Sequence, residues 1–238
     1  MSEYNNFEEM TVGQIVTADF RAAAIFRNAG IDFCCGGDKS LGLACREKNT
    51  SETDLLEELN ELAKTEPTPG VNYNEWDLGF LADYIVNTHH KFVMKTLPEM
   101  VIYTKKIHTA HGMNHPELTE IAILSQKVNE ELLQHLKKEE EVLFPAIKEV
   151  LKNDSMAAKG VILSEIYRMK SEHEFAGEAM DRINELAGGY IVPEDGCVTY
   201  KLTYDLLKRF EDDLHVHVHL ENNILYPKAL RLCSPEEN

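Results

Sequence analysis

The chain has 238 residues, of which 43% are hydrophobic, so it can form one large domain or two unequal ones with a packed core. Its formal net charge of −17 opposes binding to nucleic acid or to an anionic membrane surface. The sequence contains no apolar run long enough to cross a bilayer and no secretion signal, and its cysteines follow no regular pattern. We therefore expect a cytoplasmic protein without a disulfide scaffold.

The first part of the chain predicts a small helical domain. Apolar residues recur at helical spacing from Val12 to Ile25, and Gly30 is a typical C-terminal stop. A turn with the sequence Asp-Phe-Cys-Cys-Gly-Gly follows at residues 32–37. Two further helices are predicted, at about residues 38–47 and 52–64, the second capped by Ser51.

A linker follows these helices. Residues 65–70 contain Pro67, Pro69 and Gly70, which forbid a continuing helix. We therefore predict a small helical domain over residues 1–66, a linker over 67–75 and a second domain over 76–238.

The second domain reads as four long helices with short connections. They are predicted at about residues 76–108, 116–152, 155–187 and 199–232, with one weak strand signal at 190–192. Pro145 and Pro227 should each bend or end a helix, and the pattern does not choose between these. The expected fold class is all-α, an antiparallel four-helix bundle, in which facing helices build metal sites in the core.

One motif occurs twice in the bundle. The pattern His-x-x-x-Glu-x-x-(Val/Ile)-Leu-(Phe/Tyr)-Pro begins at His135, with Glu139, and again at His217, with Glu221. A His and a Glu four positions apart lie on one face of a helix, so both side chains can reach one metal ion. A second histidine pair, His90 and His173, repeats with nearly the same period.

Several neighbouring residues compete for these roles. His89 adjoins His90, and the period favours His90 by only one residue, so spacing alone leaves this choice open. His215 and His219 form an alternative pair, but they lie off the face of Glu221 and have no counterpart around His135. Glu140 and Glu141 are expected to face solvent.

The candidate ligands are four histidines and two glutamates: His90, His135, Glu139, His173, His217 and Glu221. This set exceeds what one tetrahedral zinc ion needs. It suits two ions, each bound by two imidazoles and bridged by both carboxylates, and it favours iron or manganese.

Together with the Cys-Cys-Gly-Gly turn, these residues resemble the iron–sulfur cluster repair di-iron proteins (RIC family) over nearly the whole chain. The resemblance implies a hemerythrin-like bundle preceded by a small helical domain. It places the family's six iron ligands on the same six residues, with Glu139 and Glu221 as bridging carboxylates of two iron ions. Whether an oxo group also bridges the two ions stays an open question. The ligand set departs from oxygen-carrying hemerythrins, which argues against reversible oxygen carriage.

The resemblance also implies a function. We expect a protein that repairs iron–sulfur clusters damaged by nitrosative or oxidative stress by supplying iron, with damaged or apo iron–sulfur proteins as partners. Two alternatives remain: an enzyme that reduces nitric oxide, and a non-catalytic sensor or iron store that binds nitric oxide or dioxygen. Whether the protein is an enzyme, and whether it is a monomer or a homodimer, stays open.

Cys34 and Cys35 are candidate redox or iron-transfer thiols. Adjacent cysteines cannot form a disulfide without a strained ring, and thiols near a helix N-terminus can have a lowered pKa. The alternative is a buried turn of small residues. Cys45, Cys197 and Cys233 have no partner spacing and are predicted to be inert.

Overall fold

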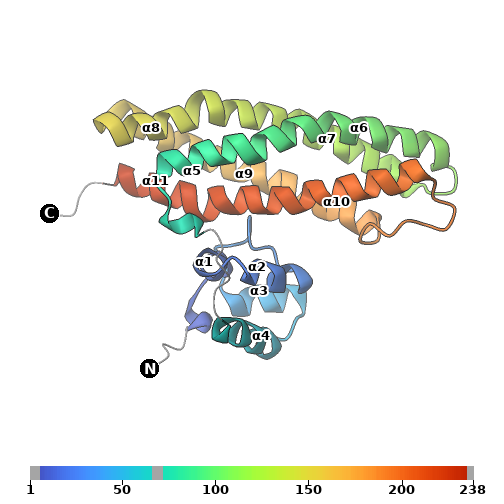
Figure 1. Ribbon diagram of the computed structural model, residues 1–238, viewed down its shortest axis with the longest axis horizontal. Helices are drawn as coiled ribbons and strands as arrows, with labels where there is room; N and C mark the ends of the chain where they lie inside the picture. Colours follow the sequence, from blue (N-terminus) through green and yellow to red (C-terminus); the bar gives the residue numbers. More distant parts are fainter. Residues whose placement is uncertain (1–5, 66–71, 235–238) are drawn as a thin grey trace.

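The structure, a computed structural model, describes residues 6–65 and 72–234 (Figure 1). All regular elements in these ranges are helical, and one isolated β-bridge joins Thr11 to Ser40. The predicted all-α class is confirmed. The weak strand signal at 190–192 was wrong, because this segment is a loop in which Tyr190 has a positive φ of 64°. Among the described helices, none is long and apolar enough to span a membrane.

Short helices fill the N-terminal region, residues 6–65. They are η1 (Phe7–Glu9), α1 (Val12–Ala18), α2 (Ala22–Asn28), α3 (Leu41–Lys48) and α4 (Glu52–Lys64). The single helix predicted between Val12 and Ile25 is broken, because Asp19 is extended at φ −144° and its carboxylate accepts a hydrogen bond from the Arg21 backbone N–H at 3.0 Å. Gly30 ends α2 as predicted, at φ 67°.

Four long rods build the bundle (Figure 1). The first is α5 (Leu78–Ile85), η3 (Val86–His90) and α6 (Lys91–His111); the second is α7 (Glu117–Lys138), η4 (Glu139–Leu143) and α8 (Phe144–Asn153). The third is α9 (Met156–Leu186), and the fourth is α10 (Val198–His219), η5 (Leu220–Leu225) and α11 (Tyr226–Cys233). The predicted antiparallel four-helix bundle is confirmed.

The prolines of the repeated motif neither end nor break their rods. Pro145 and Pro227 lie in the first turn of α8 and α11, directly after the π-helical segments η4 and η5. Proline lacks an N–H and its ring crowds the carbonyl four residues earlier. A turn widened by one residue accommodates both effects, so the helix continues through the proline.

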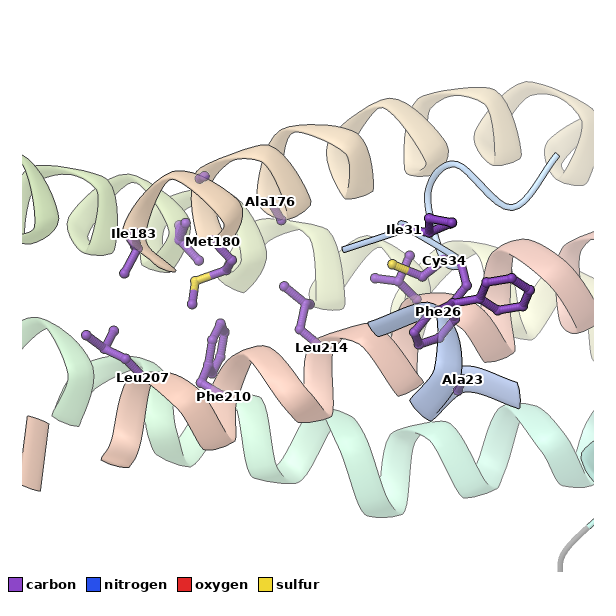
Figure 2. Packing of buried hydrophobic residues seen from close by; sticks show 14 of the residues in the cluster. Ala23, Phe26, Ile31, Cys34, Ala176, Met180, Ile183, Leu207, Phe210 and Leu214 are labelled. Atoms are coloured by element: carbon purple, nitrogen blue, oxygen red, sulfur yellow. The ribbon is translucent and has the colours of Figure 1, made fainter. Parts of the chain in front are cut away.

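The N-terminal region is docked on the bundle. Its buried side chains belong to one hydrophobic cluster with those of α6, α7, α9 and α10. Figure 2 shows Phe26, Ile31 and Cys34 close to α9 and α10, which contribute Met180 and Leu214 to the same cluster. The metal-ligand helices and the Cys-Cys turn are therefore held in one packed unit.

Part of the predicted linker is ordered. Residues 67–71 lie outside the described residues, but Tyr73–Glu75 form the 3₁₀-helix η2. The Tyr73 ring packs between Phe20 of the N-terminal region, at 6.0 Å, and Trp76, at 4.9 Å. The chain is thus anchored where it enters the bundle.

Substituting Gly13 with alanine should weaken this docking. The Gly13 N–H donates to the Gly37 carbonyl at 2.7 Å, and a Cβ there would lie 2.8 Å from that oxygen and 2.5 Å from Oδ1 of Asn223. We expect Gly13→Ala to lower the free energy of unfolding by roughly 1–3 kcal/mol, because the backbone must shift. Gly160→Ala is the control, since its Cβ would meet open space, and it should be neutral or stabilising by up to about 1 kcal/mol. Equal denaturant midpoints for both variants would contradict this.

Candidate metal centre

The six predicted ligand residues meet in the bundle core, and each is at most 1% exposed. They form two groups of four whose donor atoms lie within 4.8 Å of one another. One group is His90, Glu139, His217 and Glu221; the other is His135, Glu139, His173 and Glu221. Because both carboxylates belong to both groups, the geometry suits two ions that share Glu139 and Glu221.

Distances between the donor atoms match the edges of coordination polyhedra. Neighbouring ligands at right angles on bonds of about 2.1 Å lie about 3 Å apart. Four contacts between an imidazole and a carboxylate are of this kind: His135 Nε2–Glu139 Oε2 at 3.2 Å, His90 Nε2–Glu139 Oε2 at 3.3 Å, His173 Nε2–Glu221 Oε2 at 3.1 Å and His217 Nε2–Glu221 Oε1 at 3.1 Å. Nε2 of His135 and Nε2 of His173 also lie 2.9 Å apart.

Three π-helical segments present these side chains. His90 is the last residue of η3, Glu139 is the first of η4, and Glu221 lies in η5. A π turn inserts one residue and so rotates the next part of the helix relative to an uninterrupted α-helix; such turns are frequent at functional sites. The π-helical segments in three of the four rods thus lie at the candidate metal centre.

Several buried atoms of the centre lack a hydrogen-bond partner among the described residues: Nε2 of His90 and one oxygen each of Glu139 and Glu221. Buried polar atoms in folded proteins are nearly always satisfied. An imidazole nitrogen and two carboxylate oxygens that converge without partners are suited to bind a metal ion, so the residues present fit one.

Without metal, protons balance the charges of the centre. Burial alone would lower the pKa of His90 and His135, but the neighbouring carboxylates, Glu139 above all, raise each to about 10. Burial and Glu221 would raise the pKa of Glu139, yet His135 and His90 hold it at about 2. A metal ion bound here would therefore compete with protons for these imidazoles.

Outer partners orient three of the four histidines through their Nδ1–H. His90 donates to Glu140 at 2.9 Å, His135 to Glu172 at 2.9 Å, and His173 to Asn222 at 3.0 Å. These bonds fix the tautomer that leaves Nε2 free for metal.

Glu140 was expected to face solvent, but it is only partly exposed and contacts a candidate ligand. Glu140 reaches across to His90 on the neighbouring rod, a contact that the helical face of Glu140 alone does not reveal. Glu172 and Asn222 were missed for the same reason, since their roles depend on how helices pack.

Tyr226 holds one of the two carboxylates that both groups share. Its buried hydroxyl donates to Oε1 of Glu139 at 2.5 Å. The matching position of the first motif is Phe144, so this bond has no counterpart at that position. The Phe/Tyr difference between the copies is the signal that could have identified it.

Substituting Tyr226 with phenylalanine should weaken metal binding without abolishing it. Losing an outer-shell hydrogen bond typically costs about 10–100-fold in metal affinity, because the ligand is no longer oriented. Competition with a coloured chelator measures the affinity. Tyr167→Phe on the exposed face of α9 is the matched control and should leave it unchanged. Equal affinities of the two variants would rule out this role of Tyr226.

The competing histidines lie outside both groups. His89 donates from Nδ1 to Asp213 at 3.0 Å. The His219 ring packs against Phe20 and Phe33, with centroids 5.8 Å apart in each case. The structure thus brings His90, not His89, to the two shared carboxylates.

Cys34 and Cys35 are free thiols with sulfurs 3.9 Å apart. The carboxylate of Asp32 accepts the backbone N–H groups of Cys34, Cys35 and Gly36, and the Cys34 thiol donates to it at 3.1 Å. The adjacent Cys35 thiol and burial raise the pKa of Cys34. The prediction of a lowered pKa was therefore wrong for Cys34, and α3 begins only at Leu41, seven positions later in the chain.

This turn touches the metal-site helices. Asn222 donates from Nδ2 to the Cys34 carbonyl at 3.2 Å while its Oδ1 accepts from His173. The Cys35 thiol lies 3.5 Å from the carbonyl oxygen of His173. The thiols are thus adjacent to the centre, yet neither belongs to its groups of ligand atoms.

Cys197 differs from the inert residue that was predicted. It is exposed, and its thiol lies 3.2 Å from Nε2 of His111. The hydrogen bond with His111 lowers the pKa of Cys197 to about 7. Spacing in the sequence does not show that this histidine is near, so the surroundings of Cys197 could not be predicted.

Comparisons with known proteins agree with this architecture. The family described as "Hemerythrin HHE cation binding domain" matches residues 81–229, and one described as "Domain of Unknown function (DUF542)" matches residues 8–63. The chain is 33% identical over 223 residues to the iron-sulfur cluster repair protein ScdA of Staphylococcus epidermidis, covering 93% of this chain and 98% of the relative. It is 32% identical to the iron-sulfur cluster repair protein YtfE of Pectobacterium atrosepticum, covering 94% and 98%. A hemerythrin-like domain implies iron binding, and the buried His and Glu cluster fits it. The chain therefore belongs to the ScdA/YtfE family of iron-sulfur cluster repair proteins, with a hemerythrin-like domain.

Proposed function

We propose that the centre holds two iron ions bridged by Glu139 and Glu221, and that the protein supplies iron to iron–sulfur clusters damaged by nitrosative or oxidative stress. The observation that carries the proposal is the pair of four-residue groups sharing both carboxylates. Iron bound there would supply an exchangeable metal with open coordination positions. His90 and His217 would bind one ion, and His135 and His173 the other.

The ligand chemistry favours release to a cluster. Soft thiolates, the ligands of iron–sulfur clusters, bind iron in competition with the imidazoles and carboxylates of this centre. If iron left, His90 and His135 would be able to take up protons, because the neighbouring carboxylates raise the pKa of both to about 10. The buried carboxylates then stay compensated, so the bundle can give up its metal without unpaired charges in its core.

We assign the Cys34–Cys35 turn to the exchange step. Donor atoms of Asp32, Cys34 and Cys35 lie within 4.8 Å of one another, and the turn borders a cavity of about 540 Å³. Its contacts to His173 and Asn222 put it beside the centre. Thiols in this place could accept an iron ion on its way to a partner.

The partner class follows from the names of the relatives. Both are iron-sulfur cluster repair proteins, so the proposed partners of this chain are damaged or apo iron–sulfur proteins. We propose that this activity takes place in the cytoplasm. The proposal is compatible with a monomer and with a homodimer.

A transfer experiment tests the proposal. Iron-loaded protein incubated anaerobically with an apo iron–sulfur protein and sulfide should lose iron and restore the acceptor's cluster absorption. Reduction of nitric oxide to nitrous oxide by the loaded protein, without iron loss, would instead identify an enzyme. Reversible binding of nitric oxide or dioxygen with neither activity would identify a sensor.

Replacing both cysteines of the turn with serine should separate storage from transfer. The Cys34→Ser/Cys35→Ser variant should keep both irons, because no thiol belongs to the ligand groups of the centre, and should lose transfer to the acceptor. Metal analysis and acceptor absorption are the two readouts. Cys45→Ser is the control, as a buried thiol elsewhere in the N-terminal region. Iron loss in the double variant would make the turn part of the centre, and full transfer would make it structural.

A further inference from the structure

A second cluster of metal-ligating side chains lies apart from the six-residue centre. It consists of Asp181 on α9 with Glu211 and His215 on α10. One donor atom from each lies within 4.8 Å of the others. Glu211 and His215 are four positions apart, so one helix face presents both, and Asp181 faces them from the neighbouring rod.

This cluster opens onto two cavities at the junction of the N-terminal region and the bundle. One, of about 480 Å³, is lined by all three residues and by Gly30, Ile31 and Asp32, among others. The other, of about 540 Å³, contains Cys34 and Cys35 and shares Asp181 and His215 with the first. A cation at the cluster would therefore be reachable from solvent and close to the thiols.

One buried polar atom of the cluster, Nδ1 of His215, has no hydrogen-bond partner among the described residues. His215 lines both cavities. A buried imidazole nitrogen that has no protein partner and lies beside a cavity is available to bind water or a metal ion.

Glu211 is a buried carboxylate with a fixed orientation. It is 6% exposed, and the Asn184 side-chain amide donates to its two oxygens at 2.8 and 3.1 Å, which fixes the carboxylate. Burial, with a contribution from Asp181, raises the pKa of Glu211 to about 7. Three cations also line the cavity of about 480 Å³: Arg27, which pairs with Asp212 at 2.9 Å, Lys48 and Lys208.

We infer that Asp181, Glu211 and His215 form an auxiliary site for a divalent first-row transition cation, distinct from the two-ion centre. One imidazole and two carboxylates suit iron(II), manganese(II) or zinc, with water in the remaining positions. Because Asp181 is exposed and the cavity open, this site should bind more weakly than the buried centre. The site lies between solvent and the cavity that contains Cys34 and Cys35, so it is placed to take up metal ions from solvent.

Manganese(II) titration of the full chain tests the inference, with free manganese followed by electron paramagnetic resonance. The wild type should bind one more ion per chain than Asp181→Asn or Glu211→Gln, or bind that ion at least tenfold more tightly. Glu178→Gln is the matched control: an exposed acid one turn earlier on α9 that lines only the thiol-containing cavity of these two. It should keep the extra ion.

Equal stoichiometry and affinity in the wild type, Asp181→Asn and Glu211→Gln would overturn the site. So would an equal loss in Glu178→Gln, which would mean that general negative charge attracts the ion. Asp181 lies on the surface, so its variant should fold normally, and an unchanged melting temperature checks this. Glu221→Ala, which removes the main centre, should retain the extra ion, so the two sites can fail separately.

Discussion

Replacing Glu221 with alanine is expected to empty both metal positions rather than one. Its two oxygens contact histidines of both groups: Oε1 lies 3.1 Å from His217, and Oε2 lies 3.1 Å from His173. Removing an outer-shell group already costs about 10–100-fold in metal affinity, so losing a bridging ligand should cost more than about 100-fold. Metal analysis after desalting should find little iron, and Glu139→Ala should behave alike.

Glu141→Ala is the matched control for both variants. It lies in the same run of glutamates, and its only ion pair among the described residues is with Lys137, at 4.0 Å on the surface. Glu140 does not serve as a control, because it orients His90. If Glu221→Ala and Glu141→Ala retained the same iron content, the shared-carboxylate arrangement would be wrong.

Removing the metal should lower the melting temperature by roughly 10–20 °C. An ion that binds only the folded state stabilises it by about 2.7 kcal/mol when its free concentration is 100 times Kd, hence about 5 kcal/mol for two ions. Each kcal/mol shifts the melting temperature of a chain of this size by about 2–4 °C. The apo protein should still fold, because protonated His90 and His135 compensate the two carboxylates.

Thermal unfolding with and without a chelator measures this difference. Glu221→Ala provides the control, since a chelator should not change the melting temperature of a variant that holds no metal. Identical melting temperatures for loaded and stripped wild type would show that the buried cluster does not bind the ions tightly in the folded state.

The sequence pattern predicted the architecture and selected the candidate ligands. Helical periodicity marked the four rods, and the repeated motif selected residues that the structure brings within a few ångströms of one another. Such local patterns succeed because a residue's helical face is decided by spacing alone. The choice of His90 over His89 needed more than spacing, since the period distinguished them by one residue.

Other features depend on packing between distant segments and so left no local signal. Glu140 and Glu172 orient histidines on neighbouring rods, and Asn222 joins His173 to the Cys34 carbonyl. The π turns also escaped prediction, because a single inserted residue changes the hydrophobic period too little to detect. The break at Asp19 was hidden by apolar residues that kept helical spacing on both sides.

Anomalous X-ray diffraction at the iron edge from crystals of the iron-loaded protein tests the central claim most directly. We predict two anomalous peaks in the bundle core of each chain. One should lie among His90, His217 and the two bridging carboxylates, and the other among His135, His173 and the same carboxylates. A single peak, or iron bound by Cys34 and Cys35 with the core empty, would contradict the account.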